Sequence, residues 1–483
     1  MPMRARVLAG CVVLSWSCFP CISCKHARPI EAPPASSEAP WRYRVDVAQG
    51  GGELAIEGVF GPSSGDVFVI DPQVVAYVKE VKVQEGSSFR DVAETDEGWN
   101  LPCLGGCRVR YRFALAEVAR ALGDPETAIA SGGAYIAPTS TFLLHPSLDH
   151  DARGAIRIEV HAEEGRFFTA LHPAPEGPKG TYALDREDLR DAGFSAFGEL
   201  DHVPIDVSGA RIDVAIARAG MPLDVEATTR WLRADVAALA AEYRTFPIEH
   251  VLVVVMAHAQ SGPTRGVTLG GGGASLLIRL GREVTPSNIL ADDWVFTHEM
   301  IHVGSPDLPR EQAWFSEGLA SYLEPFVRAR AAMITAEKVW GDLLEGMPQG
   351  LPEPGDQGLD RTHTWGRTYW GGALFCLLAD LGIREATSNQ RSLDDVVRAV
   401  SAHGGNVLAR WPFARYLDVG DEATGTHVLH ELYAKMANAP VDVNLTALWK
   451  RLGVRAGPQG VVFDDGAPAA AIRRSMTRKN ESS

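Results

Sequence analysis

Residues 297–323 read THEMIHVGSPDLPREQAWFSEGLASYL, and most of what the sequence indicates about the fold depends on this stretch. His298 and His302 are one helical turn apart, so on a helix both imidazoles lie on the same face and can reach a single ion. Glu317 follows in a second predicted helix, and a hairpin of the two helices would bring its carboxylate back over the histidines. The alternative is a buried helix pair that carries two histidines without a metal.

Glu299, the residue after the first histidine, completes a His-Glu-x-x-His pattern. It lies about 100° around the helix from His298, so it is placed to contact a water held by the metal and not to bind the metal itself. Two imidazole nitrogens and one carboxylate oxygen leave a coordination position open, which is typical of catalytic zinc. The pattern therefore predicts Zn²⁺ as the cofactor.

Glu317 is the preferred third ligand, because a carboxylate in its surroundings is costly to bury unless it is paired with a charge or bound to a metal. Its apolar and aromatic neighbours are Trp314, Phe315, Leu319 and Tyr322. Glu311 and Glu324 are rival ligands, but they lie near the two ends of the predicted helix. Exposure to solvent is the simpler expectation for both.

The N-terminal region predicts export. Two arginines precede an apolar stretch that is too short for a comfortable membrane span, so residues 1–24 are predicted to be a signal peptide, either cleaved or of the lipoprotein type. Cys11 and Cys24 are both candidates for a lipid anchor, and the sequence does not choose between them. Residues 25–40 are rich in Pro and Ser, which is typical of a linker. The expected location is the periplasm or cell envelope, as a lipoprotein, or the medium as a secreted protein.

The net charge limits the kinds of partner, and the cysteines include a candidate disulfide pair. A net charge of −15 over 483 residues argues against nucleic acid or an anionic membrane surface as the main partner. Cys103 and Cys107 bracket Leu-Gly-Gly, and in an oxidising compartment they are either a small disulfide loop or two free thiols beside a turn. Cys376 lies in an apolar helical run and is expected in the core.

A chain of this length needs more than one hydrophobic core, and the fold class expected is α+β with several domains. Residues 41–205 show short alternating runs between turn residues, which predict an antiparallel, sandwich-like β domain. Residues 206–345 mix strand and helix patterns, with a helix at 224–244 and a strand carrying a glycine run at 266–280, and predict an α/β domain. Residues 346–483 read as a helical domain. Further helices are expected at 336–345, 366–384, 393–403 and 425–437.

Three segments together resemble the gluzincin clan of zinc metallopeptidases, whose catalytic domain is thermolysin-like. They are THEMIH, WFSEGLASYL and, at 367–381, RTYWGGALFCLLADL. The nearest resemblance is to the glycyl aminopeptidase family, whose members often also carry a PDZ domain, and aminopeptidase N is a more distant one. The resemblance implies that residues 206–345 form a thermolysin-like zinc peptidase domain between the β domain and the helical domain.

The resemblance also implies a role for each matching residue. The zinc ligands would be His298, His302 and Glu317. Glu299 would be the general base that takes a proton from the zinc-bound water and passes it to the leaving amine. Tyr369 would donate a hydrogen bond to the tetrahedral intermediate.

One strand departs from the family pattern. The family commonly shows Gly-Gly followed by an acidic residue upstream of the zinc helix, whereas residues 269–278 read LGGGGASLLI, with no acid. Gly271, Gly272 and Gly273 would still let a substrate backbone approach this strand closely, because no side chain stands in the way. The alternative for the glycine run is a flexible loop or a bulge.

The expected function is that of an exported, aminopeptidase-like zinc metallopeptidase acting on a peptide or protein substrate. Two alternatives stay open. One is a catalytically inactive binding protein with a peptidase fold, which the short connection between the two metal helices and the missing acid favour. The other is a zinc hydrolase of a non-peptide substrate.

Overall fold

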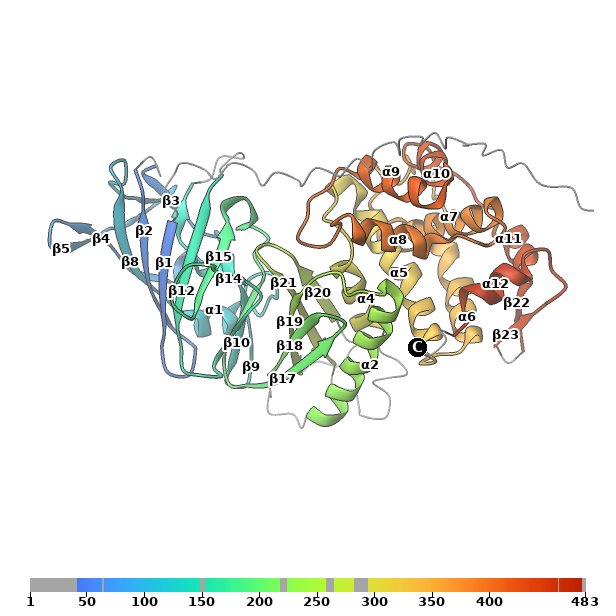
Figure 1. Ribbon diagram of the computed structural model, residues 1–483. Helices are drawn as coiled ribbons and strands as arrows, with labels where there is room; N and C mark the ends of the chain where they lie inside the picture. Colours follow the sequence, from blue (N-terminus) through green and yellow to red (C-terminus); the bar gives the residue numbers. More distant parts are fainter. Residues whose placement is uncertain are drawn as a thin grey trace, which may run out of the picture. The chain divides into compact units, whose positions relative to one another are not determined.

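The computed structural model describes residues 41–62, 65–147, 153–217, 224–257, 265–281, 294–458 and 460–479 (Figure 1). The predicted signal peptide and linker, with both candidate lipid-anchor cysteines, lie outside these residues. From Glu38 onward the chain forms one compact unit, so the boundaries drawn at 205 and 345 stay predictions. Among the described residues, no helix combines the length and apolar character that a bilayer crossing requires.

The alternating runs of the N-terminal half form an eight-stranded sheet in the order β14-β15-β12-β1-β2-β8-β4-β5. In β1 (Trp41–Val47), residues alternate between buried and exposed because one face of the sheet covers the core. The sheet is antiparallel as expected, except that β1 pairs in parallel with β12 (Ala155–His161). The remaining strands are β2 (Leu54–Phe60), β4 (Val78–Glu85), β5 (Ser88–Asp91), β8 (Cys107–Phe113), β14 (His172–Pro173) and β15 (Thr181–Asp185).

Two four-stranded sheets complete this β region. The first has the order β13-β16-β10-β9, built from Phe167–Thr169, Phe194–Gly198, Ala134–Pro138 and Ile129–Ser131. The second has the order β11-β3-β7-β6, built from His145–Pro146, Val67–Val69, Gly98–Asn100 and Glu94–Thr95. A disulfide joins Cys103 to Cys107, which confirms the first of the two expectations for this pair.

A five-stranded mixed sheet, β17-β18-β19-β21-β20, forms the centre of the next region (Figure 1). Its inner strand β19 (His250–Ala257) is buried almost throughout, as expected for a strand covered on both faces. Val251, Val253 and Val255 pack on the helical side, whereas Leu252 and Val254 pack against the β13-containing sheet. The other strands are β17 (Leu200–Val207), β18 (Ala210–Ala217), β20 (Arg265–Leu269) and β21 (Ala274–Leu280).

The glycine run does not lie within one strand, so that expectation is wrong. Strands β20 and β21 form an antiparallel pair, and the glycines make the turn between them. Gly272 and Gly273 have φ angles of +68° and +156°, a backbone region that side chains strongly disfavour. Among the described strands, β20 is the edge strand of this sheet and has a strand neighbour on one side only.

The predicted helices are present, with some shifts (Figure 1). They are α2 (Val225–Tyr243), α4 (Val295–Val303), α5 (Ala313–Arg330), α6 (Ala336–Gly346), α7 (Gly372–Ala386), α8 (Leu393–Ala402) and α10 (Val428–Met436). The helix expected from residue 425 begins three residues later, because Gly425 adopts a left-handed conformation that ends the preceding helix. The helices that had not been predicted are α1 (Leu115–Ala121), α9 (Phe413–Thr424), α11 (Leu445–Leu452) and α12 (Ala470–Met476).

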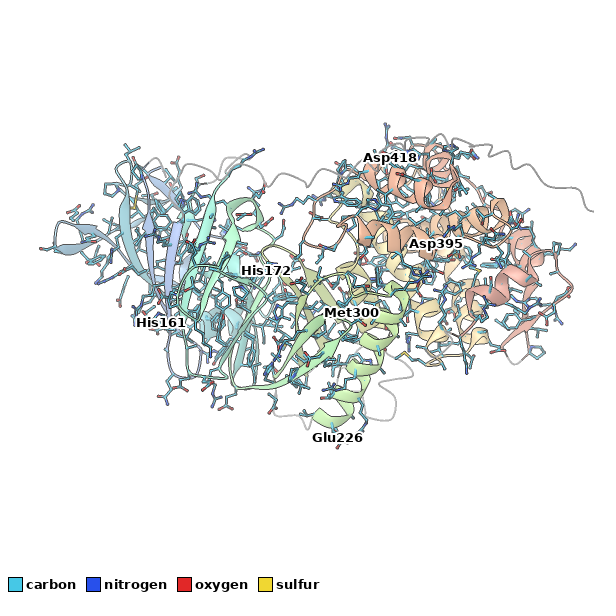
Figure 2. All side chains as sticks on the ribbon, viewed as in Figure 1. His161, His172, Glu226, Met300, Asp395 and Asp418 are labelled. Carbon is cyan, nitrogen blue, oxygen red and sulfur yellow. A yellow bond between two sulfur atoms is a disulfide. The ribbon has the colours of Figure 1, made fainter. Side chains whose placement is uncertain are left out.

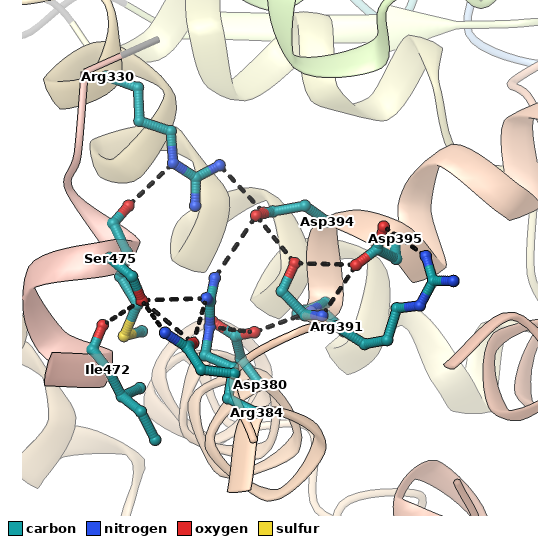
Figure 3. A network of polar contacts seen from close by, with 12 residues as sticks. Arg330, Asp380, Arg384, Arg391, Asp394, Asp395, Ile472 and Ser475 are labelled. Carbon is teal, nitrogen blue, oxygen red and sulfur yellow. Dashed lines mark hydrogen bonds and ion pairs between the residues drawn. The ribbon is translucent and has the colours of Figure 1, made fainter. Parts of the chain in front are cut away.

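A buried network of charges joins several of these helices (Figure 3). Arg330, at the end of α5, pairs with Glu242 of α2 at 2.7 Å and with Asp394 of α8 at 3.0 Å. Its Nε also donates to the Met476 carbonyl of α12 at 2.8 Å. Because buried charges are tolerated only when paired, this network fixes the far end of α5 among its neighbours.

Replacing Arg330 with Met should lower the free energy of unfolding by about 3–5 kcal/mol, because it leaves buried carboxylates short of a positive partner. The matched control is Lys338→Met. Lys338 forms an exposed pair with Asp342 one turn along α6, and such pairs contribute about 0.3–0.5 kcal/mol. Urea denaturation of both variants measures the difference, and equal losses would show that the buried network does not hold the helices.

Candidate active site

Helix α4 divides its residues between the core and a cavity. Met300 and Ile301 are fully buried, and Figure 2 labels Met300 in the interior. His298 and His302 point the other way and face each other, with 3.3 Å between their Nε2 atoms. The helix begins at Val295 and ends at Val303, with Gly304 as its C-cap.

Helix α5 returns over α4 and brings Glu317 to the histidines. A Glu317 carboxylate oxygen lies 3.3 Å from Nε2 of His298 and 3.6 Å from Nε2 of His302. The predicted hairpin of two helices is therefore present. Glu311 is exposed, as expected, but the expectation for Glu324 is wrong: its carboxylate is buried and pairs with Arg328 at 2.7 Å, because α5 continues beyond it to Arg330.

The three ligand atoms fit a zinc ion. Tetrahedral coordination with bonds of about 2.0–2.1 Å separates neighbouring ligand atoms by about 3.3–3.4 Å, close to the separations found here. Burial alone would lower the pKa of His302, but the Glu317 carboxylate outweighs it and raises this pKa to about 9. Although burial opposes the charge on Glu317, the two histidines hold the pKa of its carboxyl well below its usual range. The cluster thus brings together one negatively charged carboxylate and two imidazoles.

Two glycines set the position of Glu317. An added Cβ on Gly318 would overlap the backbone of Gly372, and one on Gly372 would overlap the Trp314 carbonyl. Helices α5 and α7 therefore touch backbone to backbone directly beside Glu317. No other residue type allows this approach, because every other side chain begins with a Cβ.

Glu299 lies between α4 and the edge strand β20. Its carboxylate accepts a hydrogen bond of 2.6 Å from the Thr268 hydroxyl, whose oxygen is also 3.1 Å from the Glu299 carbonyl. An added Cβ on Gly266 would overlap the Glu299 side chain, so this strand carries a glycine where the carboxylate needs room. The sequence indicated Glu299 but not Thr268, because the pairing of β20 with α4 is a tertiary contact.

Tyr369 faces the same cavity from a π-helical turn, Arg367–Gly371, that precedes α7. Its ring stacks on His298 with the centroids 6.3 Å apart. Burial and the nearby carboxylates of Glu317 and Glu299 raise the pKa of Tyr369 to about 12, so the phenol stays protonated and able to donate. A buried ion pair of 2.7 Å between Arg367 and Asp356 supports the turn.

A cavity of about 920 Å³ contains all of these groups. Gly271 also lines it, although an added Cβ there would overlap the carbonyls of Asp188 and Asp191. Gly272 and Gly273 pack against Leu184 and the Ala170 carbonyl, where an added Cβ would also overlap protein atoms. The space beside these two glycines is therefore filled by the β region. The cavity wall also includes Trp365, together with residues that the sequence did not indicate: Arg265, Arg279, Trp294, Leu408 and Arg410.

Arg410 joins three parts of the chain at the cavity wall. It pairs with Asp188 at 2.9 Å and Asp191 at 3.2 Å, both from the β region, and with Asp307 at 3.4 Å, in the connection between α4 and α5. All four residues line the cavity. Nothing in the sequence distinguishes Arg410 from other arginines, because its partners are distant along the chain.

Comparison with solved structures identifies the fold. An aminopeptidase N family protein from Idiomarina loihiensis superposes with a TM-score of 0.66 at 13% identity, over 86% of this chain and 78% of that one. An M1 zinc metallopeptidase from Deinococcus radiodurans matches with a TM-score of 0.46 at 16% identity, over 84% of this chain and 94% of that one. No protein-family model and no curated protein matches the sequence. The chain thus has the multidomain fold seen in the Idiomarina protein.

Gly318→Ala should lower the free energy of unfolding by about 1–3 kcal/mol and reduce zinc content, because α5 must move away from α7 and take Glu317 with it. Gly341→Ala in α6 is the matched control. An added Cβ there lies 3.6 Å from its nearest neighbour, so this helix should gain about 0.5–1 kcal/mol. Thermal unfolding and metal analysis distinguish the two, and an unaffected Gly318→Ala protein would contradict the close approach.

The purified protein should contain one zinc ion per chain, and Glu317→Gln should lose most of it, since the neutral amide is a much poorer ligand than the carboxylate. Glu311→Gln, an exposed change close to the same helix, should retain the metal. Elemental mass spectrometry of dialysed protein measures both. A Glu317→Gln variant that keeps full zinc content would remove Glu317 from the ligand set.

Proposed function

We propose that this chain is an exported zinc metallopeptidase, aminopeptidase-like in its catalytic domain. The observation that carries the proposal is the set of ligand atoms on His298, His302 and Glu317, at separations suited to tetrahedral zinc, with Glu299 and Tyr369 in the same cavity. The motif resemblance to the glycyl aminopeptidase family supports it at a finer level than the fold does.

The roles of the individual residues follow from their positions. Zinc, when bound, would raise the acidity of a water and polarise the scissile carbonyl. Glu299 takes the proton from the attacking water and passes it to the leaving amine, and the Thr268 hydroxyl orients its carboxylate for this. The Tyr369 hydroxyl, protonated at neutral pH, donates to the oxyanion that forms.

The edge of β20 supplies the surface for the substrate backbone in this proposal. An extended peptide adds to a free sheet edge through main-chain hydrogen bonds, and such binding tolerates many side chains. Because β20 lies directly over Glu299, a peptide on this edge brings its backbone close to the general base. Gly271 lines the cavity at one end of the strand, but the carbonyls of Asp188 and Asp191 occupy the space beside its Cα, so it is not part of the proposed backbone site.

Export and attachment to the cell envelope, or secretion, are part of the proposal. Their support is the predicted signal peptide together with the Cys103–Cys107 disulfide, because disulfides persist in oxidising compartments. Cys11 and Cys24 remain the two candidates for the lipid anchor.

Glu299→Gln should abolish peptide hydrolysis, because the amide cannot accept the proton from water. Zinc should stay bound, because residue 299 is not one of the proposed metal ligands. Tyr369→Phe should lower kcat by about 10²–10³, the usual effect of losing one oxyanion donor. Hydrolysis of a peptide library with and without chelator, combined with metal analysis, measures both. Full activity of Glu299→Gln would exclude this base, and zinc binding without hydrolysis of any peptide would favour the inactive binding protein or a non-peptide substrate.

A further inference from the structure

Two arginines in the cavity wall have no part in the proposed chemistry. Arg265 and Arg279 are direct partners across β20 and β21, so their side chains lie on the same face of the sheet, and both line the cavity. Within the chain ranges that the structure describes, neither guanidinium has a carboxylate within the 4.0 Å of an ion pair.

This arrangement is unfavourable without an anion. Like charges directly opposite one another destabilise an antiparallel pair. Burial and the charge of Arg265 lower the pKa of Arg279, and Asp124 only partly offsets this. The Asp124 carboxylate is already used within its own turn, where it accepts the Glu126 amide at 3.0 Å. Glu126 also lines the cavity, but no carboxylate of the described residues lies within ion-pair distance of either guanidinium.

The arginine pair lies at one end of the strand that would carry the substrate. Arg265 is the first residue of β20, and the next residue, Gly266, contacts Glu299. The strand spans about 13 Å, at about 3.3 Å per residue, which is the length of about four residues of extended peptide. A group bound by these arginines is thus only a few residues from the bond that Glu299 would act on.

The opposite end of β20 carries the opposite charge. Gly270 and Gly271 follow the strand there, and the nearby cavity wall holds the carboxylates of Asp188, Asp191 and Asp307 against the single guanidinium of Arg410. A peptide running antiparallel to β20 places its amino end towards these carboxylates and its carboxyl end towards the arginines. Both ends of such a peptide meet the charge that attracts them.

We propose that Arg265 and Arg279 form a subsite for a carboxylate of the bound peptide, either its C-terminal carboxylate or an acidic side chain near that end. This inference rests on the proposed peptidase function, because it places a peptide on the edge of β20. Guanidinium groups match a carboxylate in shape as well as charge, and pairs of this type are among the strongest hydrogen-bonded contacts. The preferred substrates are then short peptides that have a free C-terminal carboxylate or an acidic side chain near the C-terminus.

Three probes separate the two sources of the carboxylate: tetraalanine, tetraalanine amide, and Ala-Ala-Ala-Asp amide. Zinc-loaded Glu299→Gln protein, which should not turn them over, allows their binding to be measured by calorimetry. Tetraalanine should bind about tenfold more tightly than its amide. If the aspartyl amide binds as tightly as tetraalanine, a side-chain carboxylate is accepted, and if it binds like the plain amide, only the terminal carboxylate is.

Arg265→Gln and Arg279→Gln, each added to Glu299→Gln, should bring the ratio of the binding affinities for tetraalanine and its amide towards one. Arg230→Gln, an exposed change on α2, should leave the ratio as it was. Equal binding of tetraalanine and its amide, or an unchanged ratio in both arginine variants, would overturn the subsite.

Hydrolysis by the protein with Glu299 intact separates this inference from the proposed function. Cleavage of peptide acids and amides with equal kcat/KM would support the peptidase and remove the carboxylate subsite. A strong binding preference for the acid without cleavage of any peptide would support the subsite and remove the peptidase function.

Discussion

The contact between Gly318 and Gly372 determines whether the site can exist. It lets α5 and α7 meet backbone to backbone, so that Glu317, the residue before the first glycine, lies next to the turn that holds Tyr369. An ordinary side chain at either position would separate the helices by the width of a methyl group or more. Glu317, the proposed metal ligand, and Tyr369, the proposed oxyanion donor, are therefore placed by one packing constraint and not by two independent ones.

Glu299, the proposed general base, is positioned by a different element. Glu299 extends from α4 into a space under β20 that exists because residue 266 is a glycine, and Thr268 of the same strand donates to it. The strand that would receive the peptide backbone thus also orients Glu299, the proposed general base. In the proposed function, the same five residues, Arg265–Leu269, would both orient Glu299 and receive the substrate.

Local patterns in the sequence were sufficient for much of the fold. Alternation predicted the strands of the β region, and the spacing of His298, His302 and Glu317 predicted two helices that meet. The features that the sequence did not predict depend on contacts between residues far apart in the chain. Glu324 stands near the end of the predicted helix, yet neighbouring elements bury it beside Arg328. The π-helical turn at Tyr369 has no sequence signal, because an ion pair with Asp356 supports it. The wall of the cavity, with Arg265 and Arg410, could not be predicted for the same reason.

Helix α5 is held in place by contacts near both of its ends. Near its start it carries the carboxylate that faces the two imidazoles, and at its last residue Arg330 is locked between α2, α8 and α12. The second anchorage does not involve the cation. A chain emptied of its ion should consequently keep this helix in register and take up a new ion without refolding, so that exchange of one divalent metal for another becomes a local event at the cavity.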